Sequence, residues 1–262
     1  MEETSANSKN ESVMVCIMPW AGLKRELQIG KIRFLPRDHI KTKNIGIQNL
    51  LTDYFKGFVD DHGNPVNTIA ICSYEGKAFI DLCEDQWQQM RFARNALVFS
   101  VICPQVLLSI RGNSTGLCSA ERFYVIGQRL CIGHRNIYIK AGYNLKIGQM
   151  GYTKISKPQQ VADKSMAQPN EELMQGFDRL ASNVSFTDLQ RRLFQSLEWF
   201  RLAHVEADQV SELSKIVMMA TAFEVLLNLS VSDKSIDFAQ KVEKWLASQD
   251  SIKETLKHGR TS

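Results

Sequence analysis

The last third of the chain contains no proline and repeats its apolar residues at helical spacing. Of the features of the sequence, this one most limits the folds that the chain can adopt. The final proline is Pro169. From residue 187 onward, apolar residues recur every three or four positions, which is typical of helices with a buried face. They are Leu189, Leu193, Leu197 and Phe200, then Leu213, Ile216, Val217, Ala220, Phe223, Val225 and Leu226, then Phe238, Val242, Trp245 and Leu246. The pattern predicts helices over 187–206, 208–229 and 234–248, the second capped by Asp208, and a last short helix over 251–259.

The earlier part of the chain alternates short strand-like runs with helical patterns. A helix over 84–103 is expected to end at Pro104. The strand pattern of "ELQIGKIRFLP" changes phase at Gly30, which indicates a strand with a bulge or bend. The β-rich runs "ERFYVIGQRLCIG" and "RNIYIKAGYN" predict a hairpin. Asn170 is expected to cap a short helix.

Together these patterns predict an α+β fold, in which a mixed β-rich N-terminal domain precedes an all-α bundle. We divide the chain into a disordered tail over 1–12, a mixed α/β domain over 13–150, a linker with one short helix over 151–186 and a helical domain over 187–262. The aromatic residues of the N-terminal domain, Trp20, Tyr54, Phe58 and Trp87, stand in apolar contexts and are expected in its core.

Composition excludes several classes of protein. A hydrophobic content of 44% is too high for a disordered chain, and a net charge of +4 is too mild to establish a nucleic-acid partner. The N-terminal sequence has no signal-peptide pattern, and the apolar window 96–110 is too short to span a bilayer. The six cysteines form no Cys-x-x-Cys and are interpreted as buried thiols. We therefore expect a cytoplasmic protein without a membrane partner.

The chain lacks the usual motifs of cofactor and catalytic sites. It contains no Gly-x-Gly-x-x-Gly, no P-loop lysine, no Gly-x-Ser-x-Gly and no His-Glu-x-x-His. The five histidines are scattered along the sequence, so no metal site and no cofactor are predicted.

Three residues of the helical region stand out as candidates for a site. Arg201 and His204 follow the aromatic pair Trp199-Phe200 near the end of one helix. The simpler interpretation of His204 is a core histidine bonded to backbone, and the functional one is a catalytic histidine. Glu224 lies within a run of large hydrophobes. It is either a boundary residue on an exposed strip or a carboxylate that faces an Arg or His across the bundle.

A resemblance extends these observations. The string "LEWFRLAHVEADQVSELSKIVMMATAFEVLLN", followed by "IDFAQKVEKWLA", resembles the first three helices of an Apea-like HEPN domain. The resemblance implies RNA as a partner, a homodimer, and a metal-independent endoribonuclease of the prokaryotic toxin or antiviral-defence kind. Such enzymes carry an Arg-x(4–6)-His motif, in which arginine braces the scissile phosphate and histidine transfers a proton.

This chain departs from that motif. The nearest helical match is Lys253 to His258 in "KETLKHG", where lysine replaces arginine and lacks its fork geometry. The preferred explanation is an incomplete bundle that ends before the motif-bearing helix. The others are a degenerate domain without catalysis and a shortened motif formed by Lys253 and His258.

Three functional hypotheses follow. The first is a HEPN-type ribonuclease whose catalytic motif is absent, so that the 262-residue chain is inactive. The second is a module that binds RNA or a partner protein, or dimerises, without chemistry. The third is a scaffold whose helices serve packing alone. In each case the N-terminal domain is a candidate surface for a protein partner.

Overall fold

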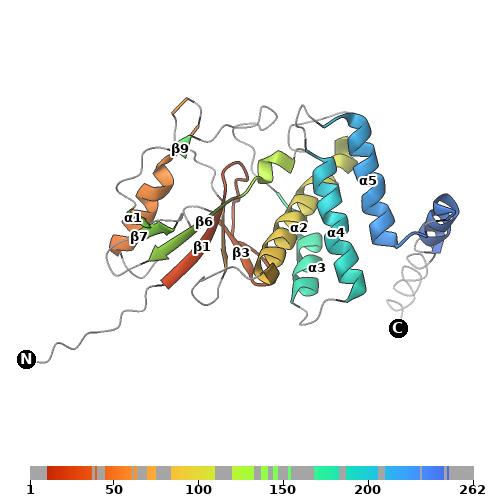
Figure 1. The fold of residues 1–262 in the computed structure, drawn as a ribbon, viewed down its shortest axis with the longest axis horizontal. Helices are drawn as coiled ribbons and strands as arrows, with labels where there is room; N and C mark the ends of the chain where they lie inside the picture. Colours follow the sequence, from red (N-terminus) through yellow and green to blue (C-terminus); the bar gives the residue numbers. More distant parts are fainter. Residues whose placement is uncertain are drawn as a thin grey trace, which may run out of the picture. The chain divides into compact units, whose positions relative to one another are not determined.

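The computed structural model divides into two compact units, which are described separately. Unit 1 comprises residues 1–184 and 204–210, and unit 2 comprises residues 185–203 and 211–262. The structure describes residues 11–36, 39, 45–60, 62–63, 70–74, 84–109, 120–132, 137–140, 144–146, 153–154, 168–182, 187–205, 210–230, 232–244 and 247, and side chains for part of these. Figure 1 shows the course of the chain.

Unit 1 is built on a sheet of seven strands. They are β1 (Glu11–Met18), β2 (Leu27–Ile29), β3 (Ile32–Pro36), β5 (Ala70–Tyr74), β6 (Ile126–Ile132), β7 (Ile137–Lys140) and β8 (Asn144–Lys146), in the order β2-β3-β5-β1-β6-β7-β8. Each neighbouring pair is antiparallel. The pairing of β6 with β7 confirms the predicted hairpin. β1 begins at Glu11, inside the segment predicted as a tail.

A tight turn at Gly30 separates β2 from β3. The prediction of one bent strand was wrong, because the two strands pair with each other and Ile29 stands opposite Ile32. Gly30 has a φ of +57°, a conformation that glycine adopts without the steric cost of a Cβ atom. The phase change in the sequence therefore marked a reversal of the chain rather than a bulge.

A short helix and a second small sheet complete this part of unit 1. Helix α1 (Ile45–Lys56) precedes β4 (Phe58–Val59), which pairs in parallel with β9 (Thr153–Lys154). Tyr54 packs edge-on against Phe55 and Phe58, with ring centroids 5.0 and 5.2 Å apart. Burial raises the pKa of the Tyr54 phenol well above its usual range. Trp20, Tyr54 and Phe58 are buried as predicted, and the side chain of Trp87 lies outside the described residues.

Helix α2 (Glu84–Ser109) continues through the proline that was expected to end it. Pro104 has no N–H to donate to the carbonyl of Ser100, four residues earlier. That carbonyl instead accepts the backbone N–H of Asn170 at 2.8 Å. The helix survives because an external donor replaces the missing bond, and the prediction of an end at Pro104 was wrong for this reason.

Helix α3 (Glu171–Ala181), which the sequence placed in a linker, packs against α2 and β2 within unit 1. Its N-cap is Asn170, as predicted, and the side chain of Asn170 accepts the N–H of Leu173 at 3.0 Å. The ring of Phe177 lies edge-on to Phe92 and to Phe99, both of α2, with centroids 6.0 Å apart in each pair. Between α2 and β6 lies a short 3-10 helix, η3 (Ala120–Phe123).

Unit 2 contains an antiparallel pair of helices, α4 (Asp188–Ala203) and α5 (Glu212–Leu227), which pack side by side in Figure 1. A third helical stretch covers residues 234–244. The N-cap of α5 is Ser211, whose side chain accepts the N–H of Ser214 at 3.1 Å. The predicted cap, Asp208, lies outside the described residues, and the helix begins later than expected.

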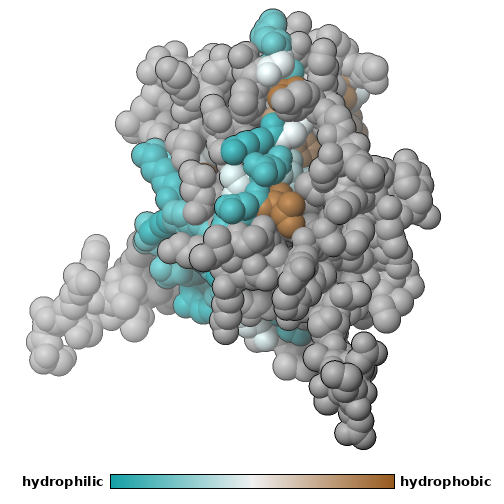
Figure 2. All heavy atoms as spheres, turned by 90° about the vertical axis from the view of Figure 1, so that its left-hand side faces the viewer, coloured by the Kyte–Doolittle hydropathy of each residue, from teal (hydrophilic) through white to brown (hydrophobic). Residues whose placement is uncertain are grey.

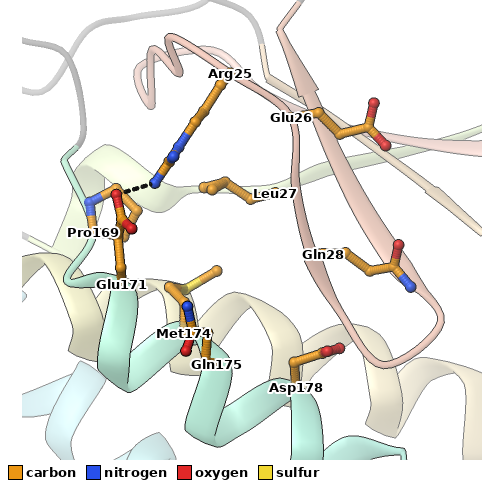
Figure 3. A pocket seen from close by; sticks show the side chains of 9 residues that line it. All are labelled: Arg25, Glu26, Leu27, Gln28, Pro169, Glu171, Met174, Gln175 and Asp178. Atoms are coloured by element: carbon orange, nitrogen blue, oxygen red, sulfur yellow. Dashed lines mark hydrogen bonds and ion pairs between the residues drawn. The ribbon is translucent and has the colours of Figure 1, made fainter.

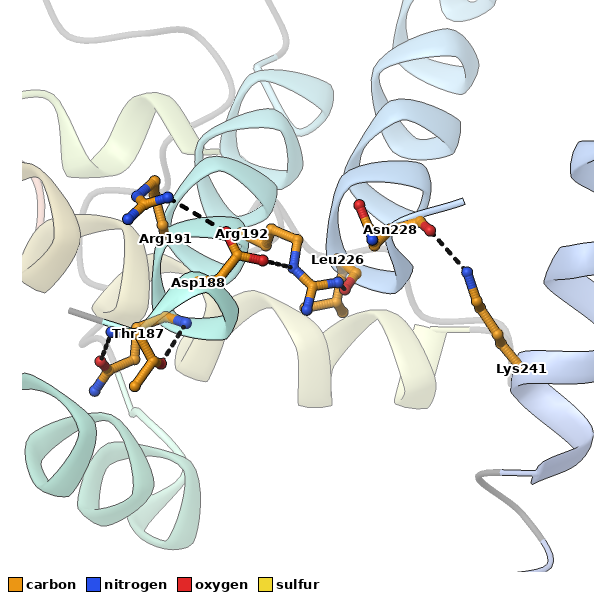
Figure 4. Close-up of polar contacts among 8 residues, drawn as sticks. Thr187, Asp188, Arg191, Arg192, Leu226, Asn228 and Lys241 are labelled. Carbon is orange, nitrogen blue, oxygen red and sulfur yellow. Dashed lines mark hydrogen bonds and ion pairs between the residues drawn. The ribbon is translucent and has the colours of Figure 1, made fainter. Parts of the chain in front are cut away.

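The ends of both helices in this pair are tied by specific hydrogen bonds, shown in Figure 4. Thr187 and Gln190 form a reciprocal capping box at the start of α4, with bonds of 2.7 and 3.2 Å. α5 ends at Asn228, which has left-handed backbone angles and begins a Schellman-type turn.

Two cations from outside α5 approach its terminal carbonyls. Arg192 donates to the oxygen of Leu226 at 3.4 Å, and Lys241 donates to that of Asn228 at 2.7 Å. α5 has no basic residue in its own last turn. The two cations thus supply the positive charge that favours a helix C-terminus.

The architecture confirms the α+β class. Among the described residues, no helix is both long enough and apolar enough to cross a membrane. On the face shown in Figure 2, the described residues are mainly hydrophilic, with a few hydrophobic residues among them.

Candidate functional site

The two charged candidate residues of the helical region each bind a close neighbour. Arg201 forms an ion pair of 2.6 Å with Glu198, one turn earlier on α4, and its side chain is only 19% exposed. Glu224 forms an ion pair of 2.7 Å with Lys234, which lies at the start of the third helical stretch. These ion pairs neutralise the charges of Arg201 and Glu224, so each of the two residues has a structural role within unit 2.

Of the other predicted site residues, the structure describes His204 but not Lys253 or His258. The backbone carbonyl of His204 accepts the N–H of Ala120 at 2.8 Å, and its side chain is half-buried. Lys253 and His258, proposed as a shortened catalytic motif, lie outside the described residues, as does the short helix predicted over 251–259. The hypothesis that Lys253 and His258 form a catalytic pair therefore stays a prediction.

The most unusual surface of unit 2 is an exposed apolar face of α5. In this helix of sixteen residues, Ala222 is the one residue that is fully buried. The opposite side is formed by Leu213, Ile216, Val217, Ala220 and Phe223, which are all exposed. We call these five residues the open face of α5. Successive members lie three, one, three and three positions apart, which places them on one side of the helix.

Sequence reasoning found the apolar residues of α5, and the hypothesis of an incomplete bundle implied a bare apolar groove on these helices, but it did not predict which side of α5 would be exposed. The signal was present, because apolar residues occur all round this helix, and such a helix is normally enclosed. In unit 2, α4 covers one side of α5. Large apolar side chains therefore face solvent on the other side.

The third helical stretch, residues 234–244, adds to this apolar surface. The ring of Phe238 packs edge-on against Phe223 at 6.2 Å, and both Phe238 and Ile236 are exposed. Asp237 fixes the start of this stretch by accepting the N–H of Ser230 at 2.7 Å. A hydrogen bond from Lys241, together with that from Ser230, lowers the pKa of the Asp237 carboxyl. Six of the nine large hydrophobic residues that are exposed in the described structure belong to α5 and this stretch.

A groove of about 260 Å³ lies between β2 and α3 in unit 1, and Figure 3 shows it. Its charged groups are already matched. Arg25 pairs with Glu171 at 2.6 Å, and Glu26 pairs with Arg33 at 2.6 Å. Asp178 accepts the backbone N–H of Gly30 at 2.8 Å. The groove thus offers polar contacts but no unpaired charge with which to select a ligand.

The described part of the chain shows no arrangement suited to metal or thiol chemistry. No group of three or more His, Cys, Asp or Glu residues within it could hold a metal ion. Cys103 on α2 is a free thiol, and burial raises its pKa. A raised pKa lowers the thiolate fraction, so Cys103 is a poor nucleophile. The surface that stands out is the open face of α5.

Comparison of the chain with models of protein families, with curated proteins and with solved structures finds no match. The resemblance to HEPN domains consequently stays a prediction, based on the residues quoted above.

Proposed function

We propose that unit 2 is a docking module that self-associates through the open face of α5. The single observation that carries this proposal is the exposure of a helix that is apolar on all sides and buries only Ala222 fully. Burial of one large apolar side chain contributes roughly 1.5–3 kcal/mol relative to full exposure. The open face therefore gains stability when a second protein surface covers it.

The contacts of the candidate catalytic residues favour binding over chemistry. The guanidinium of Arg201 is mostly covered and is neutralised by Glu198. A residue that braces a phosphate in a cleavage reaction needs an accessible guanidinium fork. Glu224 is neutralised by Lys234. Both ion pairs lie within unit 2 and occupy the charged groups of the two candidate residues, which suits the non-catalytic module among the three hypotheses.

Replacement of Val217 by glutamate tests the docking function. Val217 is 57% exposed on the open face, so a charge there is tolerated in the single chain but opposes association. We expect the parent chain to self-associate with rising concentration in sedimentation velocity. We expect Val217→Glu to weaken this association at least tenfold, which corresponds to about 1.4 kcal/mol.

Leu189 on α4 provides the matched control. It is also 57% exposed but lies outside the open face. Leu189→Glu introduces the same charge and should leave the dissociation constant unchanged, while circular dichroism should show equal helix content in both variants. A parent chain that stays monomeric, or equal weakening by the two substitutions, contradicts the proposal.

A second candidate function is the HEPN-type endoribonuclease with RNA as its substrate. The observation that favours it is the order of helices in unit 2, where α4 and α5 are followed by the stretch 234–244 that carries Phe238-Ala239-Gln240-Lys241. This order matches the first three helices expected from the resemblance. It supports the architecture of such a domain but supplies no catalytic group.

Incubation of the 262-residue chain with fluorescently labelled single-stranded RNA separates the two candidates. We expect no cleavage above background, because lysine lacks the bidentate geometry of arginine at position 253. Robust cleavage that His258→Ala abolishes would replace the docking proposal with the ribonuclease. Cleavage that persists in His258→Ala would indicate a contaminating nuclease. The assay would then be repeated with independently purified protein.

A further inference from the structure

We infer that the outer edge of β2 in unit 1 binds an extended segment of a partner protein, which adds to the sheet as a further strand. The segment lies in the groove between β2 and α3 and forms main-chain hydrogen bonds with Gln28. This site belongs to unit 1, so the inference is independent of the docking function proposed for unit 2.

The backbone of Gln28 is directed toward an edge that has no neighbouring strand. β2 is the first strand in the order of the sheet, and among the described residues it pairs with β3 alone. A two-residue turn joins Ile29 to Ile32, and in such a turn the carbonyl of the first residue accepts the N–H of the fourth. Because opposite pairs in an antiparallel ladder alternate between bonded and non-bonded, the N–H and C=O of Gln28 point away from β3.

The groove of about 260 Å³ follows this edge. Glu26, Leu27 and Gln28, which are consecutive in the chain, all line it. Consecutive side chains of a strand point to opposite faces, and Figure 3 shows Leu27 pointing to one side of β2 and Glu26 and Gln28 to the other. Residues of both orientations can share one groove only where the groove reaches the main chain, so the groove gives access to the backbone of β2.

Side chains already take the place of a neighbouring strand at the end of β2. Two positions after Gln28, the backbone N–H of Gly30 donates to Oδ1 of Asp178 at 2.8 Å. The carbonyl of Gly30 accepts the side-chain Nε2 of Gln28 at 2.9 Å. Both main-chain groups of Gly30 are thereby satisfied. The main-chain groups of Gln28 are the next along this edge, and they are the ones that an added strand can reach.

The dimensions of the groove suit a short extended segment. The residues of α3 that line it run from Glu171 to Asp178, seven positions that correspond to about 10 Å along a helix. About three residues of an extended chain cover this distance. The ion pair between Arg25 and Glu171 marks one end of the groove, and the hydrogen bond between Asp178 and Gly30 marks the other.

The lining of the groove indicates the chemistry of the segment. Its centre is apolar, because Leu27 is half-buried and Met174 is buried there. Since the charges around it are matched, we expect recognition through the main chain and one apolar side chain between two polar ones. Short edge strands with charged neighbours such as Arg25 and Glu26 resist uncontrolled pairing. The site therefore suits a weakly bound segment rather than aggregation.

Titration of the isotopically labelled full chain with a capped pentapeptide of alternating serine and valine tests the inference by amide NMR. We expect saturable shifts of the Leu27 and Gln28 amide signals, with a dissociation constant in the micromolar-to-millimolar range. The same peptide with N-methylated backbone amides is the matched ligand control. It has no N–H to donate to β2, so we expect it to bind at least tenfold more weakly.

Two substitutions at Gln28 test the same contact from the side of the protein. Gln28→Pro removes the outward N–H and leaves the bonds to β3 in place, and proline is accepted on edge strands. We expect it to weaken binding of the pentapeptide at least tenfold. Gln28→Ala is the control, because it loses the same side-chain bond to Gly30 but keeps the N–H, and it should bind as the parent chain does. Unchanged amide signals of β3 show that the hairpin is intact in both variants.

The outcomes that overturn the inference are distinct. They are the absence of saturable shifts in the parent chain, shifts confined to residues outside the groove, and equal binding of the N-methylated peptide. Equal binding by Gln28→Pro and Gln28→Ala also overturns it. Shifts at Gln28 that grow with protein concentration in the absence of peptide identify a second copy as the occupant and overturn the inference of a partner segment.

Discussion

Phe177→Ala is expected to lower the free energy of unfolding by about 3–5 kcal/mol. Phe177 is 6% exposed and fills the space between α3 and α2. Its ring meets Phe92 and Phe99 at interplanar angles of 83° and 88°. Alanine would remove both edge-on contacts and leave a cavity that the surrounding helices fill only in part. Urea denaturation followed by circular dichroism measures the change.

The matched control makes the same chemical change on the surface. Phe223 is 47% exposed on the open face of α5, so Phe223→Ala removes much less buried area. Measured at low concentration, where the chain is monomeric, it should cost about 1 kcal/mol. If the two substitutions destabilised the protein equally, the packing of α3 on α2 would not contribute as the structure indicates.

Gly30→Ala is expected to destabilise unit 1 by about 2–4 kcal/mol through two separate effects. The left-handed φ of +57° is unfavourable for any residue with a Cβ. In addition, a Cβ at this position would lie 2.9 Å from the Cβ of Ala181 and 3.4 Å from its carbonyl oxygen. These atoms are held by α3 and have no flexible end that could move away. The hydrogen bond from Gly30 to Asp178 would be strained by the same displacement.

Gly63→Ala separates the two effects. Gly63 also has a positive φ, +83°, but among the described residues no heavy atom beyond its chain neighbours lies within 4 Å of the position of its Cβ. Gly63→Ala should therefore show the backbone cost alone, about 1–2 kcal/mol. Thermal and urea unfolding of both variants gives the difference between them. A difference near zero would show that α3 does not press against the β2–β3 turn.

Local features of the sequence predicted individual helices, strands and caps better than they predicted how these elements contact one another. The Asn170 cap and the β6–β7 hairpin depend on neighbouring residues, and both were confirmed. The turn at Gly30 was missed because a change of alternation arises equally from a bulge and from a two-residue turn. The continuation of α2 through Pro104 depends on an N–H that lies 66 positions later, at Asn170, and no local pattern contains it.

For the candidate site, too, the sequence predicted local structure but not tertiary contacts. Apolar spacing predicted α5, with its end within two residues of the observed one. Which of its sides would remain uncovered depends on how many other elements surround the helix, and that is a property of the tertiary packing. Equally, the bonds from Arg201 to Glu198 and from Glu224 to Lys234 compete with any catalytic role for these residues. A residue type in a sequence does not reveal such competition.

The carbonyl of Ser100 has a consequence for how unit 1 tolerates change. Because a single unpaired oxygen inside α2 accepts the N–H of Asn170, it determines the position of α3 along α2 to within one residue. Strands β6 to β9 are held by their own partners in the two sheets, so the segment that joins β9 to α3 need only be long enough to reach α2. Insertions and deletions in that segment can therefore accumulate over evolution without shifting α3, provided that Pro104 and the backbone N–H at position 170 are both retained.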